Sequence, residues 1–431
     1  MEVPKNIGSQ IYGLIESLYP YCRSITGDGV RKTLSTVSEL IPIKQFEIKT
    51  GTKVFDWEIP KEWNIRDAYI KDAKGTRIVD FKKSNLHVVN YSSPVHKKLT
   101  LKELKPHLHY LKEYPDWIPY RTTYYNEDWG FCISHNQFMN LTDETYEVCI
   151  DSSLAPGFLS YAEYLIKGKT DTEILFFTHI CHPSLCNDNL SGIALTAFLA
   201  KFLSEQSLHY SYRFVFAPAT IGSITWMSSN ENILPKIKQG LVVAVCGDQG
   251  WMTYKKTKTG DEEIDRAALH VLKHSNEKYD VLEFTPYGYD ERQFCSPGIN
   301  LSMGRLTRTP NGCYPEYHTS ADNLELVKPD CLEDSFTKYL SIINIVEHNR
   351  IYINQEPKCE PQLGRRGLYR KTGGYQDIEE RQYAMLWLLN MSDGTNSLLD
   401  IAERSELNFL TILHAANDLV GKNLLRPADI N

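Results

Sequence analysis

Two kinds of hydrophobic spacing alternate along the chain. Near the N-terminus, apolar residues recur every three or four positions, which predicts helices over 7–18 and 29–40. From about 55 to 150, apolar and polar residues alternate around turn sequences such as Lys74–Gly75, which is typical of β-hairpins. Between about 160 and 349, short apolar runs alternate with helical patterns. That order predicts an α/β fold in which parallel strands are buried on both faces.

These patterns divide the chain into domains. We interpret residues 51–154 as a β-rich domain inserted into an α/β domain, which is formed by residues 1–50 and 155–350. The α/β domain is expected to have a mixed, mostly parallel sheet with helices on both faces. Residues 351–374 are rich in Pro, Gly and charge, as linkers are. Residues 375–431 contain three short helical patterns and a short wing, which predicts a winged helix-turn-helix.

Histidine and aspartate residues stand at the ends of the predicted strands. One apolar run ends in His179 and His182, and Asp188 follows at the start of a predicted helix. Asp248 ends the next apolar run, and His318 lies in a polar turn before a later helix. The carboxyl ends of parallel strands meet at one edge of a sheet, and imidazole and carboxylate are ligands of catalytic zinc. We therefore expect a metal site here, in which His179 and His182 compete for one position and Asp248 is a ligand or orients the ligands.

The composition limits the kinds of binding partner and the cellular location that we expect. The chain has 431 residues, of which 42% are hydrophobic and 23% charged, as in ordinary globular proteins with more than one core. Its net charge of −7 gives no reason to expect a nucleic acid or an anionic membrane as partner. No apolar run is long enough to span a bilayer. Ten scattered cysteines and an N-terminus without signal-peptide order favour a reducing, cytoplasmic location.

The order of these segments resembles the zinc aminopeptidase family that includes bacterial leucyl aminopeptidases and, more distantly, glutaminyl cyclases. The resemblance covers roughly residues 160–345. It is carried by His179, the helix start Asp188–Gly192, Asp248 and the turn His318–Thr319. The insertion, the sequence Cys-His-Pro-Ser and the C-terminal winged helix look closer still to aminopeptidase-like proteins of bacterial polysaccharide and secondary-metabolite gene clusters. The resemblance implies a zinc-dependent hydrolase that acts on a small peptide or an aminoacyl conjugate.

The resemblance also implies a Glu-Glu pair that this chain lacks. Alignment places Ala219 at the catalytic base and Thr220 at a metal-binding glutamate, so one zinc ion is easier to support than two. Alanine cannot take a proton from water. Three alternatives follow: the chain is a non-catalytic relative, the base has moved, or a glutamate has been replaced by design. The nearest candidates for a displaced base are Glu291, Glu316 and Asp290.

Two further residues could bind the substrate. Asp290 could meet a free amine, and Arg292 could hold a carboxylate with two hydrogen bonds. Aromatic residues of the insertion could wall the pocket, although we weigh them first as the core of that domain. They are Trp117, Tyr124, Tyr125 and Trp129.

The leading hypothesis is thus an aminopeptidase-type amide hydrolase. The alternatives are a metal- or ligand-binding protein without catalysis, and a regulator that senses a ligand. The predicted recognition segment Phe409–Val420 has no Arg or Lys to reach DNA phosphates. We therefore expect the winged helix to pack on its own or a neighbouring subunit. A homo-oligomer could form through the winged helix or through the inserted domain.

Overall fold

The computed structural model of the protein describes residues 3–142, 144–368 and 376–428. The chain forms two compact units. The larger unit contains residues 2–262 and 278–337, and the smaller unit contains residues 263–277 and 338–431. No helix within the described ranges is long and apolar enough to cross a membrane.

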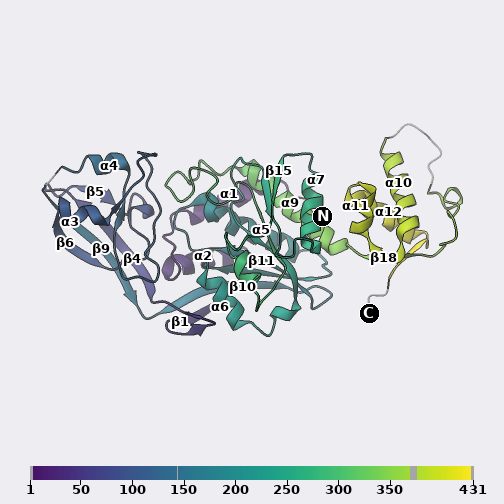
Figure 1. Ribbon diagram of the computed structural model, residues 1–431, viewed down its shortest axis with the longest axis horizontal. Helices are drawn as coiled ribbons and strands as arrows, with labels where there is room; N and C mark the ends of the chain where they lie inside the picture. Colours follow the sequence, from purple (N-terminus) through teal and green to yellow (C-terminus); the bar gives the residue numbers. More distant parts are fainter. Residues whose placement is uncertain (1–2, 143, 369–375, 429–431) are drawn as a thin grey trace. The chain divides into compact units, whose positions relative to one another are not determined.

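The larger unit is built on a mixed sheet of eight strands (Figure 1). In spatial order these are β1 (Lys44–Lys49), β10 (Phe158–Ile166), β12 (Ser211–Ala217), β11 (Glu173–His179), β13 (Ile237–Val243), β16 (Met303–Thr307), β14 (Met252–Lys255) and β15 (Tyr279–Leu282). The central strands β12, β11, β13 and β16 are parallel, and β1, β10 and β14 add antiparallel pairs. The predicted mixed, mostly parallel sheet is confirmed.

Helices lie on both faces of this sheet. They are α1 (Ile7–Leu18), α2 (Asp28–Ser38), α5 (Gly192–Ser204), α6 (Ile221–Ser229) and α8 (Glu291–Phe294). All seven residues of β11 are buried. Leu175 and Phe177 share a core with Trp226 of α6 and Phe294 of α8, while α5 packs on β11 and on α1. The apolar run of β11 is therefore covered on both sides, as its composition predicts.

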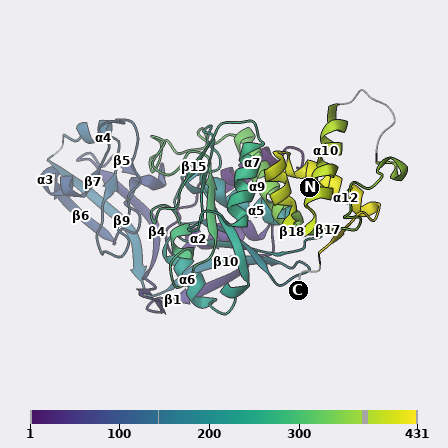
Figure 2. The ribbon, with the colours of Figure 1, turned by 45° about the vertical axis from the view of Figure 1, so that its right-hand side comes forward.

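The segment between β1 and β10 forms an antiparallel sheet in the order β5, β4, β9, β6, shown in Figure 2. Its elements are β2 (Lys53–Val54), β3 (Trp57–Glu58), β4 (Glu62–Lys71), β5 (Arg77–Asp80), β6 (Val95–Thr100), α3 (Leu101–Leu104), β7 (Leu108–His109), β8 (Phe131–Cys132), α4 (His135–Met139) and β9 (Thr145–Ala155). The β4–β5 turn is closed at Gly75, whose backbone N–H donates to the carbonyl of Asp72. The domain boundaries at 51 and 154 stay a prediction, since one compact unit contains both parts.

The smaller unit contains the predicted C-terminal winged helix. Its elements are α7 (Glu263–Lys273), β17 (Ile351–Asn354), α10 (Gln376–Met391), β18 (Asp393–Ser397), α11 (Leu398–Ser405), α12 (Phe409–Gly421) and β19 (Leu425–Pro427). The helix α9 (Pro329–His348) passes from the larger unit into this one. Strand β17 lies in the segment predicted as a linker and is the middle strand of the sheet β18–β17–β19. Residues 369–375 of that segment lie outside the described residues.

Helix α7 packs against the winged helix inside the smaller unit. Its Arg266 forms ion pairs with Asp400 (2.6 Å) and Glu403 (2.5 Å) of α11. The first backbone N–H of α12, from Phe409, donates to Nε2 of His270 (3.0 Å). The N-terminus of a recognition helix is the part that usually enters the DNA groove. In this chain a side chain of α7 already occupies it.

Candidate metal centre

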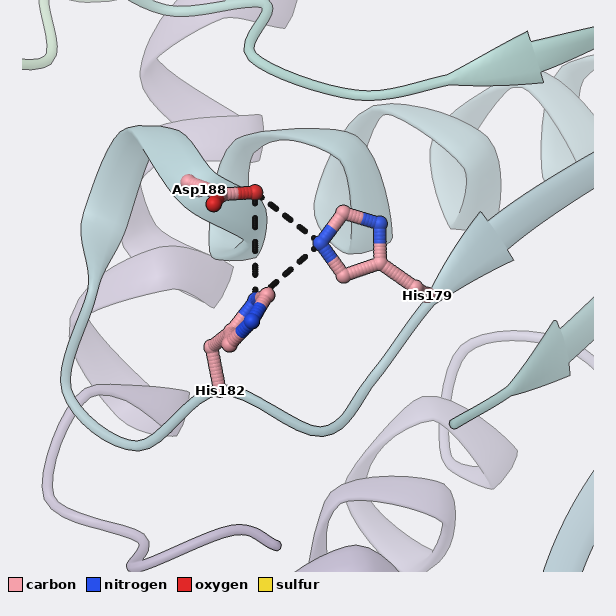
Figure 3. A group of neighbouring side chains, drawn as sticks. All are labelled: His179, His182 and Asp188. Carbon is pink, nitrogen blue, oxygen red and sulfur yellow. Dashed lines mark hydrogen bonds and ion pairs between the residues drawn. The ribbon is translucent and has the colours of Figure 1, made fainter. Parts of the chain in front are cut away.

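Three side chains meet at the carboxyl end of β11 (Figure 3). His179 is the last residue of that strand, His182 lies in the loop after it, and Asp188 lies in the turn that leads into α5. Nε2 of His179 is 2.9 Å from Oδ1 of Asp188 and 3.1 Å from Nδ1 of His182. Nδ1 of His182 is 3.8 Å from the same Asp188 oxygen. The two histidines that competed in the sequence therefore both face Asp188.

His318 reaches the same carboxylate from the other end of the chain. Its Nε2 is 3.0 Å from Oδ2 of Asp188, so the second carboxylate oxygen is also engaged. His318 has a left-handed backbone (φ 55°), and its ring is stacked on that of Tyr317 with centroids 3.9 Å apart. The backbone N–H of Tyr120, from the insertion, donates to the His318 carbonyl (2.7 Å). Loop contacts from two parts of the chain thus hold this imidazole in place.

The spacing of these atoms suits a metal ion. Zinc bonds of about 2.0–2.1 Å in a tetrahedral site place neighbouring ligand atoms roughly 3.3 Å apart. The observed separations of 2.9, 3.1 and 3.8 Å bracket that value. In addition, Nε2 of His179 lies against both the Asp188 oxygen and Nδ1 of His182, where one nitrogen can make only one of these two hydrogen bonds with its own proton. A cation between these atoms would satisfy all of them, so the donor set fits a metal.

The electrostatics favour the protonation states that bind metal. Burial lowers the pKa of His182 to about 3, and the neighbouring His179 and His318 add to this, although Asp188 opposes it. Burial alone would raise the pKa of Asp188, but His182 and the hydrogen bonds from His179 and His318 outweigh it and hold the pKa well below its usual value. At neutral pH His182 is therefore a neutral imidazole and Asp188 a carboxylate. Those are the forms that a metal requires.

Asp248 lies apart from this cluster. Its carboxylate accepts hydrogen bonds from the side-chain amide of Asn187 (2.8 Å), the backbone N–H of Gly250 (2.7 Å) and the hydroxyl of Thr309 (2.5 Å). Because Asn187 precedes Asp188, Asp248 orients the ligand loop from behind. Its role as a further metal ligand stays a prediction.

Asp322 is a second support of the same loop, and sequence reasoning missed it. Its two carboxylate oxygens accept the backbone N–H groups of Asn187 (2.6 Å) and Asp188 (3.0 Å). Since Asp322 lies four residues after His318, one turn carries both a ligand and a residue that positions the other ligand. The sequence signal was the presence of an aspartate four residues after the candidate ligand His318.

Tyr289 and Tyr120 were also missed. The hydroxyl of Tyr289 donates to Oδ1 of Asp188 (3.2 Å), and its ring lies against that of His179 with centroids 5.0 Å apart. The ring of Tyr120 contacts the edges of His182 and His318. Tyr289 adjoins the candidate Asp290, whereas nothing in the local sequence of Tyr120 indicates its place.

The candidate bases are in different surroundings. Glu291 is buried and its Oε1 accepts from Nζ of Lys255 (2.9 Å) and lies 3.4 Å from Nη1 of Arg305, so its charge is compensated by two cations. Asp290 is buried too, but no cation pairs with it in the same way: Oδ1 accepts from the hydroxyl of Ser223 (2.6 Å), and Oδ2, like Oε2 of Glu291, has no partner among the described residues. Burial raises the pKa of Asp290 to about 6. Of these two carboxylates, Asp290 has the environment of a group that exchanges a proton.

The other predicted catalytic and substrate-binding residues make no hydrogen bond to the metal cluster among the contacts of the described residues. Ala219 and Thr220 follow β12 and are half-buried, and the carbonyl of Ala219 accepts from the thiol of Cys181, 3.8 Å away. Arg292 is half-buried, and its Nε has no partner among the described residues. Glu316 is half-buried in the turn before His318, where its carbonyl accepts from Thr319. The catalytic and substrate-binding roles of these residues stay predictions.

Known proteins match both parts of the chain. The model of the family "Domain of unknown function (DUF4910)" matches residues 12–349, and a winged helix-turn-helix model matches residues 350–427. A Clostridium acetobutylicum protein is 55% identical over 419 residues, which cover 97% of this chain and 96% of that protein. Its provisional name is polysaccharide biosynthesis protein with aminopeptidase-like domain.

Two solved structures place the fold. A crystal structure of a Clostridium acetobutylicum protein, provisionally named a peptidase, has a TM-score of 0.94 at 54% identity and covers 98% of this chain and 96% of that one. A zinc aminopeptidase from Bacillus subtilis has a TM-score of 0.58 at 12% identity, over 80% of this chain and 96% of that one. The second likeness shows an aminopeptidase-like α/β fold.

Proposed function

The chain belongs to the DUF4910 family, and we propose that it is a zinc-dependent amide hydrolase of the aminopeptidase type. One observation carries the proposal. His179, His182 and Asp188 bring ligand atoms within 4.8 Å of one another at the carboxyl edge of an aminopeptidase-like sheet, and His318 contacts the second oxygen of Asp188. His179, His182, Asp188 and His318 would hold one zinc ion, and the absence of the Glu-Glu pair argues against a second.

The residues around the cluster define the chemistry. Bound zinc supplies a water of lowered pKa and polarises the amide carbonyl. The Tyr289 hydroxyl donates its one hydrogen to Asp188 and so orients that carboxylate. Asp290 is the favoured proton acceptor, because its carboxylate contacts Ser223, which lies 2.8 Å from the Thr220 carbonyl beside the position of the missing glutamate. Glu291 is disfavoured by its two ion pairs.

The proposed substrate is a small peptide or an aminoacyl conjugate. The name of the Clostridium acetobutylicum relative supports a conjugate that belongs to polysaccharide biosynthesis. Nucleic acid is not proposed as a partner, because His270 of α7 occupies the N-terminus of α12. A cytoplasmic location is also a proposal. So is a homo-oligomer, which would form through the winged helix or the insertion.

Metal analysis and amide hydrolysis test the proposal together. The full chain, purified with zinc present, is expected to retain about one zinc ion, and Asp188→Asn is expected to lose it. Asp171→Asn is the matched control, since its side chain is 79% exposed and pairs only with surface lysines. Zinc retained equally by all three proteins contradicts the site. Hydrolysis of an aminoacyl-amide panel by the parent chain and loss of it in Asp290→Asn would support the assignment of the base.

A second candidate is metal or ligand binding without catalysis. Ala219 favours it, because the position aligned with the family's base has no proton-accepting group. The two candidates differ in one result. A chain that binds zinc but hydrolyses no amide, even after Ala219→Glu, is a binding protein.

A further inference from the structure

We propose that the substrate continues beyond the reacting amide as an uncharged, ring-bearing extension, which lies on a row of aromatic side chains provided by the insertion. The inference rests on the proposed function, since it concerns the substrate of the same site. We call this row the aromatic track. Its members are Tyr120, Tyr124, Tyr125, Trp57 and Phe55.

The track begins at the metal ligands. The ring centroid of Tyr120 lies 5.3 Å from that of His182 and 5.1 Å from that of His318, nearly perpendicular to both. The hydroxyls of Tyr120 and Tyr124 are 2.8 Å apart and hydrogen-bonded. The backbone N–H of Tyr120 donates to the His318 carbonyl, and that of Ser320 donates to the carbonyl of Ile118. The insertion is therefore fixed to the ligand turn, and a group bound at the metal touches Tyr120 first.

The track continues outward in steps of about one ring. The ring centroids of Tyr124 and Tyr125 are 6.4 Å apart, and those of Tyr125 and Trp57 are 5.5 Å apart, at interplanar angles of 67° and 66°. Phe55 lies in the same hairpin as Trp57. Three successive members are exposed: Tyr125 by 48%, Trp57 by 40% and Phe55 by 47%. An exposed row of large apolar side chains that continues into a site marks a binding surface.

The backbone holds two of these rings at a cost. Tyr125 (φ 69°) and Phe55 (φ 53°) are both in the left-handed region, which bulky residues rarely adopt. Folding gains little from a strained residue whose ring remains exposed. Such positions cluster where a protein presents side chains to a ligand.

A cavity lies at the outer end of the track. It has a volume of about 640 Å³ and is lined by Phe55 and by mostly apolar residues of the α/β domain, within the same unit. Besides Phe55 these include Leu234, Pro235, Ile237, Ile299 and Leu301. A volume of this size holds a group larger than one amino-acid side chain. The end of the proposed extension would fit in this cavity.

The chemistry of the track selects a flat, uncharged group. None of its five side chains is charged, and the tyrosines present an apolar ring with a hydroxyl at its tip. A sugar ring and an aromatic side chain both combine an apolar face with a polar or neutral rim. Both classes share the contact that this surface offers, and binding probes can separate them.

Three hydroxamates test the inference by calorimetry on the zinc-loaded full chain. The probes are acetohydroxamate, the same chelator extended by a biphenylbutyl chain, and the chelator extended by a chain that ends in a β-glucoside. We expect one extended probe to bind at least tenfold more tightly than acetohydroxamate. Trp57→Ala and Tyr125→Ala should each weaken that probe about 2- to 10-fold and leave acetohydroxamate unchanged. The tighter of the two extended probes identifies an aromatic or a sugar extension.

The matched control is Tyr114→Ala, which removes an exposed ring that is stacked on Trp117 outside the track. Equal binding of short and extended probes, or an equal loss in Tyr114→Ala, overturns the inference. Light scattering can also contradict the inference. If the parent chain is a dimer and Trp57→Ala is a monomer, the track is a subunit interface. Trp57→Phe should restore most of the affinity and so separates a lost ring contact from a folding defect.

Failure of the proposed function gives a different pattern. If acetohydroxamate does not bind, the metal site is wrong, and the biphenyl and glucoside groups are then titrated as plain amides without the chelator. Binding that is lost in Trp57→Ala supports the track independently of the metal. No binding of either amide overturns it.

Discussion

Two buried clusters of charged side chains lie at the same sheet and differ in how their charges are balanced. In the first, Lys255 and Arg305 both lie beside Oε1 of Glu291, whereas Oε2 of Glu291 and Nε of Arg305 have no partner among the described residues. All three N–H groups of Lys255 are used, by the carbonyls of Thr285 and Tyr287 (2.7 Å each) and by Glu291 (2.9 Å). Lys255 and Arg305 are direct neighbours on the paired strands β14 and β16, so Glu291 separates two like charges.

The second cluster has no such internal balance. His179, His182 and His318 all face Asp188, and at neutral pH the site contains one carboxylate and an imidazole, His182, whose pKa is far too low for a charge. Its atoms have the spacing of ligands around a zinc ion. The difference teaches that opposite charges placed against one another indicate a structural cluster, whereas convergence of like ligand atoms indicates a cation site.

Of the predictions, Ala219→Glu has the largest expected effect, and it concerns the cluster around Asp188. A carboxylate at this position would add a general base where the resemblance expects one, in addition to the proposed proton acceptor Asp290, so amide turnover should rise by up to about 10²–10⁴-fold with little change in KM. Steady-state kinetics on an aminoacyl-amide panel measures the change. Ala219→Gln is the control, because it has the size of glutamate without the proton acceptor. An equal gain in both variants would show that volume, not proton transfer, limits turnover.

Lys255→Met tests the cluster of Lys255, Glu291 and Arg305. It leaves the buried Glu291 with one distant cation, and removing one partner of a buried ion pair typically costs about 3–5 kcal/mol of unfolding free energy. Chemical denaturation measures the loss, while zinc binding at saturating metal should be unchanged. The exposed pair of Lys167 and Asp171 provides the control, since Lys167→Met should cost less than about 1 kcal/mol. If Lys255→Met is as stable as the parent chain but binds zinc more weakly, the two clusters act as one site.

The sequence predicted the cluster around Asp188 because its ligands follow a rule of backbone topology. His179 and Asp188 stand at the end of a parallel strand and at the start of the next helix, where α/β folds place their sites. The same rule made Asp248 a candidate. Its side chain, however, bonds to Asn187 and Thr309, and strand topology does not determine such side-chain partners.

The parts that sequence reasoning missed depend on contacts between distant segments. Glu291 was a candidate base because the sequence does not reveal that Lys255 and Arg305 face it. Tyr120 reaches the ligands only because the insertion pairs with the turn of His318. Strand β17 was read as linker, since four residues are too few for a period-2 pattern to stand out among Pro and Gly.

Asp322→Asn tests whether the ligand loop is held from behind. The amide cannot accept both backbone N–H groups, of Asn187 and Asp188, so Asp188 should shift relative to the histidines. Residues that orient metal ligands typically change metal affinity 10–100-fold. Competition with a chelator measures the zinc affinity, and Asp171→Asn is again the control. Unchanged affinity with lowered stability would make Asp322 a purely structural residue.

Glu62→Gln extends the comparison to a third, partly exposed ion network and should have the smallest effect. Arg31 of α2 donates to both oxygens of Glu62 (2.7 Å each), and this hydrogen bonding is the main reason why the pKa of Glu62 falls to about 2. A folded-state pKa below the unfolded value stabilises the protein above about pH 4.5, and the contribution is lost as the pH falls towards 2.

With the Glu62 side chain 14% and that of Arg31 26% exposed, solvent screening reduces the effect to about 1 kcal/mol at pH 7. The stability difference between the parent chain and Glu62→Gln should therefore be about 1 kcal/mol at neutral pH and shrink steadily below pH 4. Thermal unfolding at a series of pH values measures it, with Glu127→Gln as the control, because Glu127 is more exposed and pairs with a single lysine. If the difference persists undiminished at pH 2.5, Glu62 contributes through packing or neutral hydrogen bonds, and the charge pairing that the comparison assigns to this network is refuted.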